Sequence, residues 1–184
     1  MTLNLQQFWR NASSKRKRIY LIVLMFVLAG IITVVGSLVP LSSSDAHAIS
    51  NQLNQTLNEH KSNNTLIEYI FLNNFGICLV MFVPIIGPVL GFIILFDTGV
   101  ALGAIASVQG YPVYISLISL VITPVFWLEF TAYSTAMAES IWLTRRLFQR
   151  RWLELKNTAI LIGICAAILI IGALVEVWLI NTFG

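Results

Sequence analysis

The sequence predicts an all-α integral membrane protein, a transmembrane helix bundle of five spans with a central hairpin broken by proline and glycine. Three observations predict this fold. Hydrophobic residues make up 58% of the 184 residues and charged residues only 10%, whereas soluble domains carry about 25% charged residues. The apolar residues are grouped in stretches of about 20, the length that a helix needs to cross a bilayer. The basic residues lie in short clusters between these stretches.

The first span is predicted from Ile19 to Pro40, because no charged residue interrupts this segment. A basic run, Lys15 to Arg18, precedes it, so a secretory signal peptide is the alternative reading. The apolar stretch is longer than a signal peptide needs, and we therefore expect a retained anchor. The chain then divides into four regions: a basic N-terminus (1–18), an anchor (19–40), a polar loop with a weak helical period (41–65) and a transmembrane core domain (66–184).

A hairpin is predicted after the polar loop. The apolar region from Leu66 to Val108 is too long for one span, and Pro84-Ile85-Ile86-Gly87-Pro88 interrupts it. Pro84 ends a helix because it has no backbone N–H to donate, whereas Pro88 suits the first turn of a new helix. We expect helices over residues 64–83 and 88–108.

The segment that follows, residues 113–143, is too long for one straight span. It contains Thr123-Pro124, so we expect a broken helix with a short first half and a main span that starts at Pro124. The final span is predicted over residues 158–181.

The charge distribution predicts the orientation in the cell membrane. Ten of the 11 basic residues form two clusters, Arg10 with 15–18 and a second one within the loop 144–157. The positive-inside rule places both clusters in the cytoplasm. The first span, the two helices of the hairpin and the broken helix give the four crossings between the clusters, an even number, as this requires. The N-terminus is then cytoplasmic, whereas the loop 41–65 and the C-terminus are extracytoplasmic.

Small residues recur at helical spacing in the predicted core domain. They are Gly87, Gly91, Gly99 and Gly103 on one helix and Ala132 and Ala136 on the next. This spacing lets helix backbones approach closely in lipid. Packing inside one subunit is the simpler interpretation, and an interface with a second copy or with another membrane protein is the alternative.

Four acidic residues lie inside predicted spans, with no Lys or Arg in the same stretches: Asp97, Glu129, Glu139 and Glu176. An ionised carboxylate at the bilayer centre costs about 2.5 to 3.5 kcal/mol, so each residue needs a hydrogen-bond donor, water or a cation. Function is best sought at these positions.

The four acids have different expected environments. Glu139 lies about two turns from Arg146, which makes an ion pair plausible. Asp97 is expected to hydrogen-bond locally with Thr98 around an irregular helix, and Glu176 to reach the outer interface. Glu129 is the leading functional candidate, because it lies in the first turns of a helix, where unpaired N–H groups and the helix dipole favour an anion.

The sequence offers no catalytic arrangement. It has no nucleophile–base pattern and no histidine inside a span, so we expect a protein that is not an enzyme and needs no cofactor or metal. Cys78 and Cys165 are expected to be buried small hydrophobic residues. The basic clusters are short and no phosphate-binding loop is present, so nucleic acid is not an expected partner.

Three blocks of sequence, covering Phe71 to the C-terminus, resemble the stage II sporulation protein M family. The first joins 71–74 to 96–103, which looks like the family's Asn-rich entry and its Asn-Gly-x-x-Leu-Gly turn, although Asp97 and Thr98 stand in place of that Asn. The second places Glu129 five residues after Pro124, and the third ends in Glu176. The family's His and Gly after the proline are replaced by Val125 and Phe126, so no role of that His transfers.

The resemblance implies a membrane scaffold and makes Glu129 and Glu176 positions of interest. In spore-forming bacteria the family member works in an envelope-remodelling complex with a peptidoglycan hydrolase. The leading functional prediction is therefore a scaffold or accessory subunit of a larger membrane complex, with the lipid bilayer and other membrane proteins or further copies of itself as partners. A transporter or channel subunit, with a proton or cation path along the embedded carboxylates, is the alternative.

Overall fold

The computed structural model describes residues 14–149 and 154–183, and every regular element in these ranges is a helix. The helices are α2 (Ser14–Ser37), α3 (Ser43–Ser62), α4 (Leu66–Met81), α5 (Gly87–Gln109), α6 (Val113–Ile122), α7 (Pro124–Phe148) and α8 (Glu154–Phe183). The all-helical fold that the sequence predicts is confirmed for this part of the chain.

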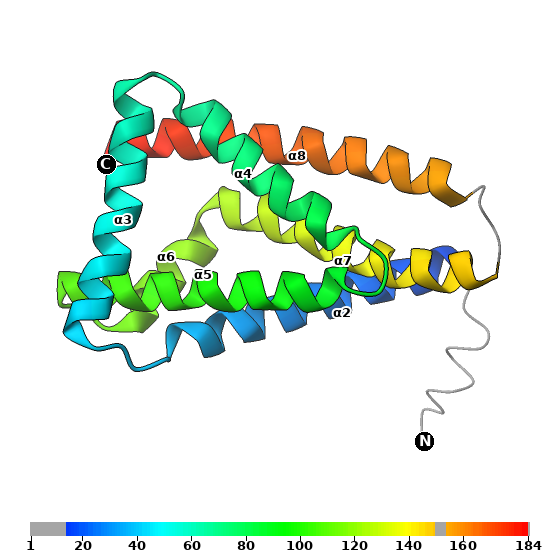
Figure 1. The fold of residues 1–184 in the computed structure, drawn as a ribbon, viewed down its shortest axis with the longest axis horizontal. Helices are drawn as coiled ribbons and strands as arrows, with labels where there is room; N and C mark the ends of the chain where they lie inside the picture. The colour runs from blue at the N-terminus through cyan, green and yellow to red at the C-terminus, as the bar shows by residue number, and fades with distance from the viewer. Residues whose placement is uncertain (1–13, 150–153, 184) are drawn as a thin grey trace.

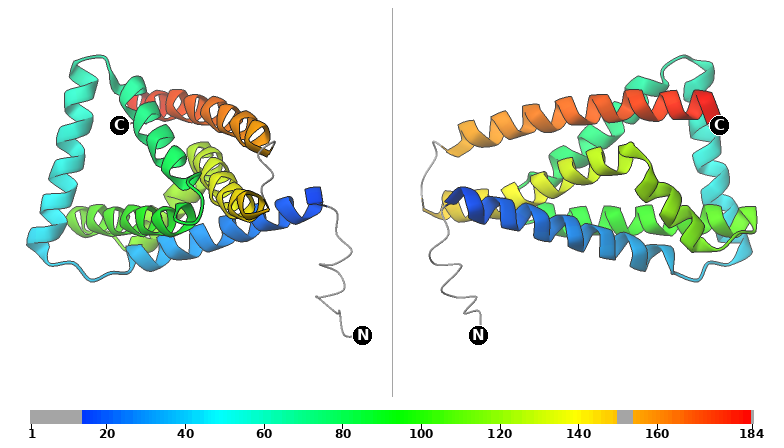
Figure 2. Two further views of the ribbon diagram at one scale, coloured as in Figure 1. Left: turned by 45° about the vertical axis from the view of Figure 1, so that its right-hand side comes forward. Right: turned by 180° about the vertical axis from the view of Figure 1, so that it is seen from behind.

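The long helices run along one axis of the molecule, and α3 lies across one end of it (Figures 1 and 2). The chain leaves the opposite end through α2, returns through α4, leaves again through α5, returns through α6 and α7, and leaves once more through α8 (Figure 1). Helix α5 packs between α2 and α7, while α8 packs against α4 and α7.

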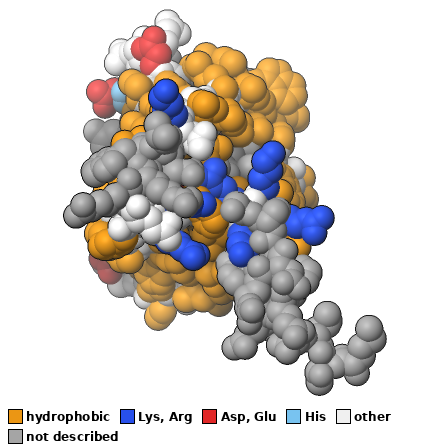
Figure 3. Space-filling view, turned by 90° about the vertical axis from the view of Figure 1, so that its right-hand side faces the viewer, with side chains coloured by type: hydrophobic (Ala, Val, Ile, Leu, Met, Phe, Trp, Pro, Cys, Tyr) orange, Lys and Arg blue, Asp and Glu red, His pale blue; other side chains and the backbone are white. Residues whose placement is uncertain are grey.

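The two basic clusters lie at the same end of the bundle. Lys and Arg side chains gather there among hydrophobic ones (Figure 3). Of the predicted clusters, Lys15 to Arg18, Arg145, Arg146 and Lys156 belong to the described residues, while Arg10, Arg150 and Arg151 lie outside them. The α3 end therefore stands opposite the basic end, as the charge distribution predicts.

Three helices, α2, α5 and α8, are long and apolar enough to cross a membrane, and the α6–α7 pair makes a fourth if it is counted as one bent span. The axes of α6 and α7 differ by 82° across Thr123, so the predicted break at Pro124 is confirmed. Helix α4 has 16 residues, which is about 24 Å at 1.5 Å per residue. It is shorter than the roughly 30 Å hydrocarbon core, so the structure supports the predicted count of five spans only in part.

Residues 43–62, predicted as a loop with a weak helical period, instead form the regular helix α3. Its start is capped, since the Ser42 hydroxyl accepts a hydrogen bond from the Asp45 backbone N–H at 3.2 Å. Asp45 lies in the first turn and Lys61 in the last, where their charges complement the helix dipole. The second predicted loop, 144–157, is also shorter, because α7 continues to Phe148 and α8 begins at Glu154.

The turn between α4 and α5 is fixed to the last part of α7. The Ser140 hydroxyl donates to the Val83 carbonyl at 2.6 Å, and the Ile85 N–H donates to the Thr144 hydroxyl at 2.8 Å. Ile85 has a φ of 74°, a conformation that a β-branched residue adopts rarely. The predicted hairpin is thus present, and its turn is held by hydrogen bonds to a third helix.

The glycine row of α5 lies on the buried side of the helix and packs against α2 and α7, and at Gly87 also against Met81 of α4. A Cβ at Gly91 would lie 2.6 Å from the Met137 sulfur on α7, whereas a Cβ at Gly103 would lie 2.7 Å from the Ser37 carbonyl oxygen on α2. Gly99 also faces α2, where Gly36 faces back toward α5. Only one half of the row therefore packs against α7, the helix that carries Ala132 and Ala136.

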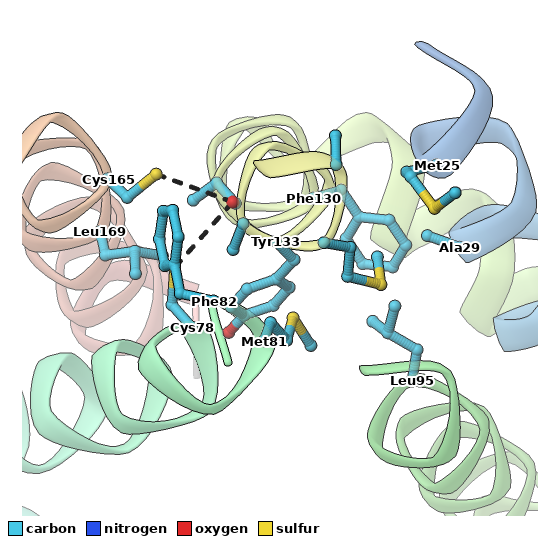
Figure 4. Packing of buried hydrophobic residues seen from close by; sticks show 14 of the residues in the cluster. Met25, Ala29, Cys78, Met81, Phe82, Leu95, Phe130, Tyr133, Cys165 and Leu169 are labelled. Atoms are coloured by element: carbon cyan, nitrogen blue, oxygen red, sulfur yellow. Dashed lines mark hydrogen bonds between the residues drawn. The ribbon is translucent and has the colours of Figure 1, made fainter. Parts of the chain in front are cut away.

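A hydrophobic core fills the middle of the bundle (Figure 4). Met25 and Ala29 enter it from α2, Leu95 from α5, Phe130 and Tyr133 from α7, and all are at most 6% exposed. Ala132 and Ala136 are completely buried in the same core.

We expect Gly103→Leu to destabilise the protein by about 3 kcal/mol, because a side chain at this position overlaps the backbone of α2 and forces the helices apart. Thermal unfolding in detergent micelles measures the change. Gly163→Leu on α8 is the matched control, since a Cβ there meets nothing within 4 Å. Equal unfolding temperatures for the two variants would contradict close packing between α2 and α5.

Candidate functional site

The four embedded acids occupy three different environments. Glu129 and Glu176 line one cavity near α3, Glu139 is buried near the basic end, and Asp97 is exposed on the outer face of α5. The structure therefore brings together two of the four predicted residues.

The cavity that holds Glu129 and Glu176 has a volume of about 310 Å³ and lies between five helices. Helix α3 contributes Leu53 and Leu57, which explains the weak helical period of that segment. The polar lining consists of two carboxylates, three amides and two hydroxyls, from Asn54, Thr56, Tyr69, Asn73, Asn74, Glu129 and Glu176. We call this cavity the outer cavity.

Glu129 is held in the outer cavity by an amide. The Asn74 side-chain nitrogen donates a hydrogen bond to Oε1 of Glu129, and Asn73 donates to the Asn74 side-chain oxygen at 3.3 Å. The break at Pro124 positions Glu129, because α7 starts there in the middle of the bundle and its second turn, which carries Glu129, faces α4. An amide donor satisfies one carboxylate oxygen but supplies no counter-charge.

The chemistry of the outer cavity follows from its lining. No Lys, Arg, His or Cys is among its described lining residues, so its carboxylates have no cation beside them there. The site offers oxygen acceptors and neutral amide donors, a set that suits hydrogen-bonded contact with a polar group.

Glu139 forms a second polar cluster, near the basic end, and it is only 3% exposed. Its Oε1 accepts a hydrogen bond from the Thr158 hydroxyl at 2.9 Å and lies 3.4 Å from a terminal guanidinium nitrogen (Nη2) of Arg18. Helices α2, α7 and α8 are thereby joined at one carboxylate. A cavity of about 110 Å³ lies beside it, lined in part by Arg18, Thr135 and Glu139.

Trp142 packs beside this cluster, which we call the inner cluster. The guanidinium carbons of Arg18 and Arg146 lie 5.2 Å and 5.0 Å from the centre of its ring. Cation–π contacts of this kind contribute about 0.5 to 2 kcal/mol each. The indole therefore helps to hold both cations at the end of the bundle.

The segment between the outer cavity and the inner cluster is hydrophobic. On α7 it is formed by Ala132, Tyr133, Ala136 and Met137, none more than 5% exposed. Cys78 and Cys165 are free thiols at 0% and 1% exposure, and both sulfurs lie near the Ala132 carbonyl oxygen (Figure 4). The prediction that they behave as buried small residues is confirmed.

Asp97 departs from its predicted environment. Helix α5 is regular around it, and the Thr98 hydroxyl donates to the Ile94 carbonyl at 2.9 Å rather than to Asp97. Within residues 14–149 and 154–183 the Asp97 carboxylate makes no hydrogen bond or ion pair and is exposed.

Sequence reasoning missed three partners of the acids. The sequence pattern places Arg18 in a terminal cluster, Thr158 at the start of a span and residues 43–62 in a loop. Helical spacing relates Glu139 to Arg146 on the same helix, whereas Arg18 lies 121 residues away. The Asn-rich segment at 71–74 was the one available signal, since its Asn74 turned out to face Glu129.

Comparison with known proteins supports the resemblance drawn from the three blocks. A family model described as stage II sporulation protein M matches residues 19–179. No curated protein and no solved structure matches the chain. Residues from the first, second and third blocks, Asn74, Glu129 and Glu176, line the same outer cavity.

We expect Arg18→Met to destabilise the protein by about 2 kcal/mol, because it leaves the buried Glu139 without this cation. In a double-mutant cycle with Glu139→Gln, the combined change should fall short of the sum by about 1 kcal/mol or more. Chemical unfolding in micelles measures both. Arg145→Met is the matched control on the exposed side of α7; strict additivity in the cycle would contradict a bond between Arg18 and Glu139.

We expect Asn74→Leu to destabilise the protein by about 2 kcal/mol, since Glu129 loses its amide donor inside the bundle. Asn73→Leu serves as the neighbouring control, because Asn73 reaches Glu129 only through Asn74. The melting temperatures of both variants are compared in the same detergent. A larger fall in melting temperature for Asn73→Leu than for Asn74→Leu would show that the Asn74 amide is not what holds Glu129.

Proposed function

The chain belongs to the stage II sporulation protein M family, and on that premise we propose that it is a non-enzymatic scaffold or accessory subunit of a larger membrane or envelope complex. The observation that carries this proposal is that two embedded acids, Glu129 and Glu139, form hydrogen bonds between helices. Glu139 joins α2, α7 and α8, and Glu129 joins α7 to α4. These contacts between helices stabilise one fixed arrangement of the bundle, which is what a scaffold requires.

The proposed topology has five crossings, with α4 as a short span and α6–α7 as one bent span. The basic end faces the cytoplasm by the positive-inside rule. The N-terminus is then cytoplasmic, while α3 and the end of α8 are extracytoplasmic. In this orientation α3 lies along the outer membrane surface, where its polar residues contact water.

A proton or cation path is the second candidate, and one observation favours it: two carboxylates line the same outer cavity. The buried segment between Glu129 and Glu139 argues against it. The two residues are ten positions apart on α7, which is about 15 Å along a helix, and the side chains between them include Tyr133 and Met137 at 5% and 0% exposure. A continuous path requires these side chains to move.

One experiment separates the two candidates. The full chain is reconstituted in liposomes and assayed for proton and cation flux, and in parallel it is extracted from its native membrane in mild detergent for native electrophoresis. The scaffold proposal predicts no flux and a particle larger than the 20.5 kDa chain with its micelle. Flux that Glu129→Gln abolishes would replace the proposal by the transport function, and a particle containing only one chain would contradict it.

A further inference from the structure

Asp97 is an embedded carboxylate that makes no hydrogen bond or ion pair with the described residues, and it faces outward. Asp97 is the eleventh of the 23 residues of α5, so it lies at the middle of a span. Its backbone is helical and the neighbouring Thr98 hydroxyl is engaged by Ile94. Neither the helix itself nor the other described residues satisfy this carboxylate.

Asp97 lies on a distinct face of α5, opposite the glycine row. Val89 and Ile93 lie eight and four positions before it on the same face and are 60% and 53% exposed. Ala104, seven positions after it, is 0% exposed, and α3 packs against α5. The exposed row therefore covers the middle of the span and its cytoplasmic half, and we call it the Asp97 face.

Lipid is a poor neighbour for this residue. An ionised carboxylate at the bilayer centre costs about 2.5 to 3.5 kcal/mol. The aspartate side chain is too short to reach an interface about 15 Å away, half of a 30 Å core. The free energy falls when a donor or a cation meets Asp97 at its own depth.

The charges of the chain decide which partner fits. Its Lys and Arg residues all lie at or beyond the ends of the spans, at positions 10, 15–18 and 61 and within the range 145–156. A second copy packed side by side would bring another carboxylate to the same depth and no cation. A helix of a different protein with Lys or Arg near its middle supplies both the counter-charge and hydrogen-bond donors.

Resting on the proposed scaffold function, we propose that the Asp97 face is a docking site for a transmembrane helix of another protein, one that carries a Lys or Arg at mid-membrane. The exposed Val89 and Ile93 pack against its apolar side chains, and the Asp97 carboxylate accepts hydrogen bonds from its cation. The pairing fixes the depth at which the two helices dock.

Site-specific photo-crosslinking in native membranes tests this inference. A photoreactive amino acid replaces Ile93 in the full-length chain, and in a control chain it replaces Ile171, an equally exposed residue of α8 (51%). Irradiation should give an adduct from position 93, and mass spectrometry should place the attachment in a transmembrane segment with a central Lys or Arg. Asp97→Asn should lower the yield of this adduct at least tenfold, whereas Asp97→Glu should retain most of it.

Four results would overturn the inference: an adduct with a second copy of this chain, an attached segment without an embedded cation, no protein adduct at all, or a yield that Asp97→Asn leaves unchanged. Thermal unfolding of Asp97→Asn checks that the variant folds. If the large particle in mild detergent persists while only position 171 yields an adduct, the docking site is wrong and the scaffold function stands. If no such particle exists, the scaffold function itself fails.

Discussion

A polar group inside the hydrocarbon core must find its partner within protein, because no water is there to replace it. This constraint explains the arrangement of most embedded polar residues of the chain. Glu129 lies against Asn74, Glu139 lies between Arg18 and Thr158, and Ser140 donates to the carbonyl of Val83. The first two contacts join different helices and the third fixes the α4–α5 turn to α7, so the requirement for satisfaction also produces cohesion between spans.

Close backbone contact supplies the rest of that cohesion. Without a hydrophobic driving force between helices, lipid-embedded spans depend on packing at short distance. Helix α5 meets α2 at Gly99 and Gly103 and α7 at Gly91, while Gly87 meets both Met81 of α4 and Ser140 of α7. Helix α5 thus packs against its neighbours through its glycine face, and the opposite face, which carries Asp97, is exposed.

The sequence predicted the features that depend on local chemistry. Pro84 and Pro88 indicated the hairpin, Thr123-Pro124 indicated the broken helix, and apolar runs indicated the long spans. It did not predict that Ser43–Ser62 form a helix, because the few apolar residues of this segment give only a weak helical period. Nor did it predict Arg18 as a partner of Glu139, since a contact across 121 residues depends on the order in which helices pack. The site was predicted in part, as Glu129 and Glu176 are brought together and Asp97 is not.

The central claim is that Glu129 and Glu139 join helices around a sealed core and do not line a water-filled path. The two native cysteines test it directly, since Cys78 and Cys165 lie in that core between the outer cavity and the inner cluster. A small charged thiol reagent is added to either side of the protein in bilayers, and modification is followed by mass spectrometry. A sealed core predicts that both thiols stay unmodified until the protein is unfolded. Rapid modification of either thiol from the aqueous phase would contradict it.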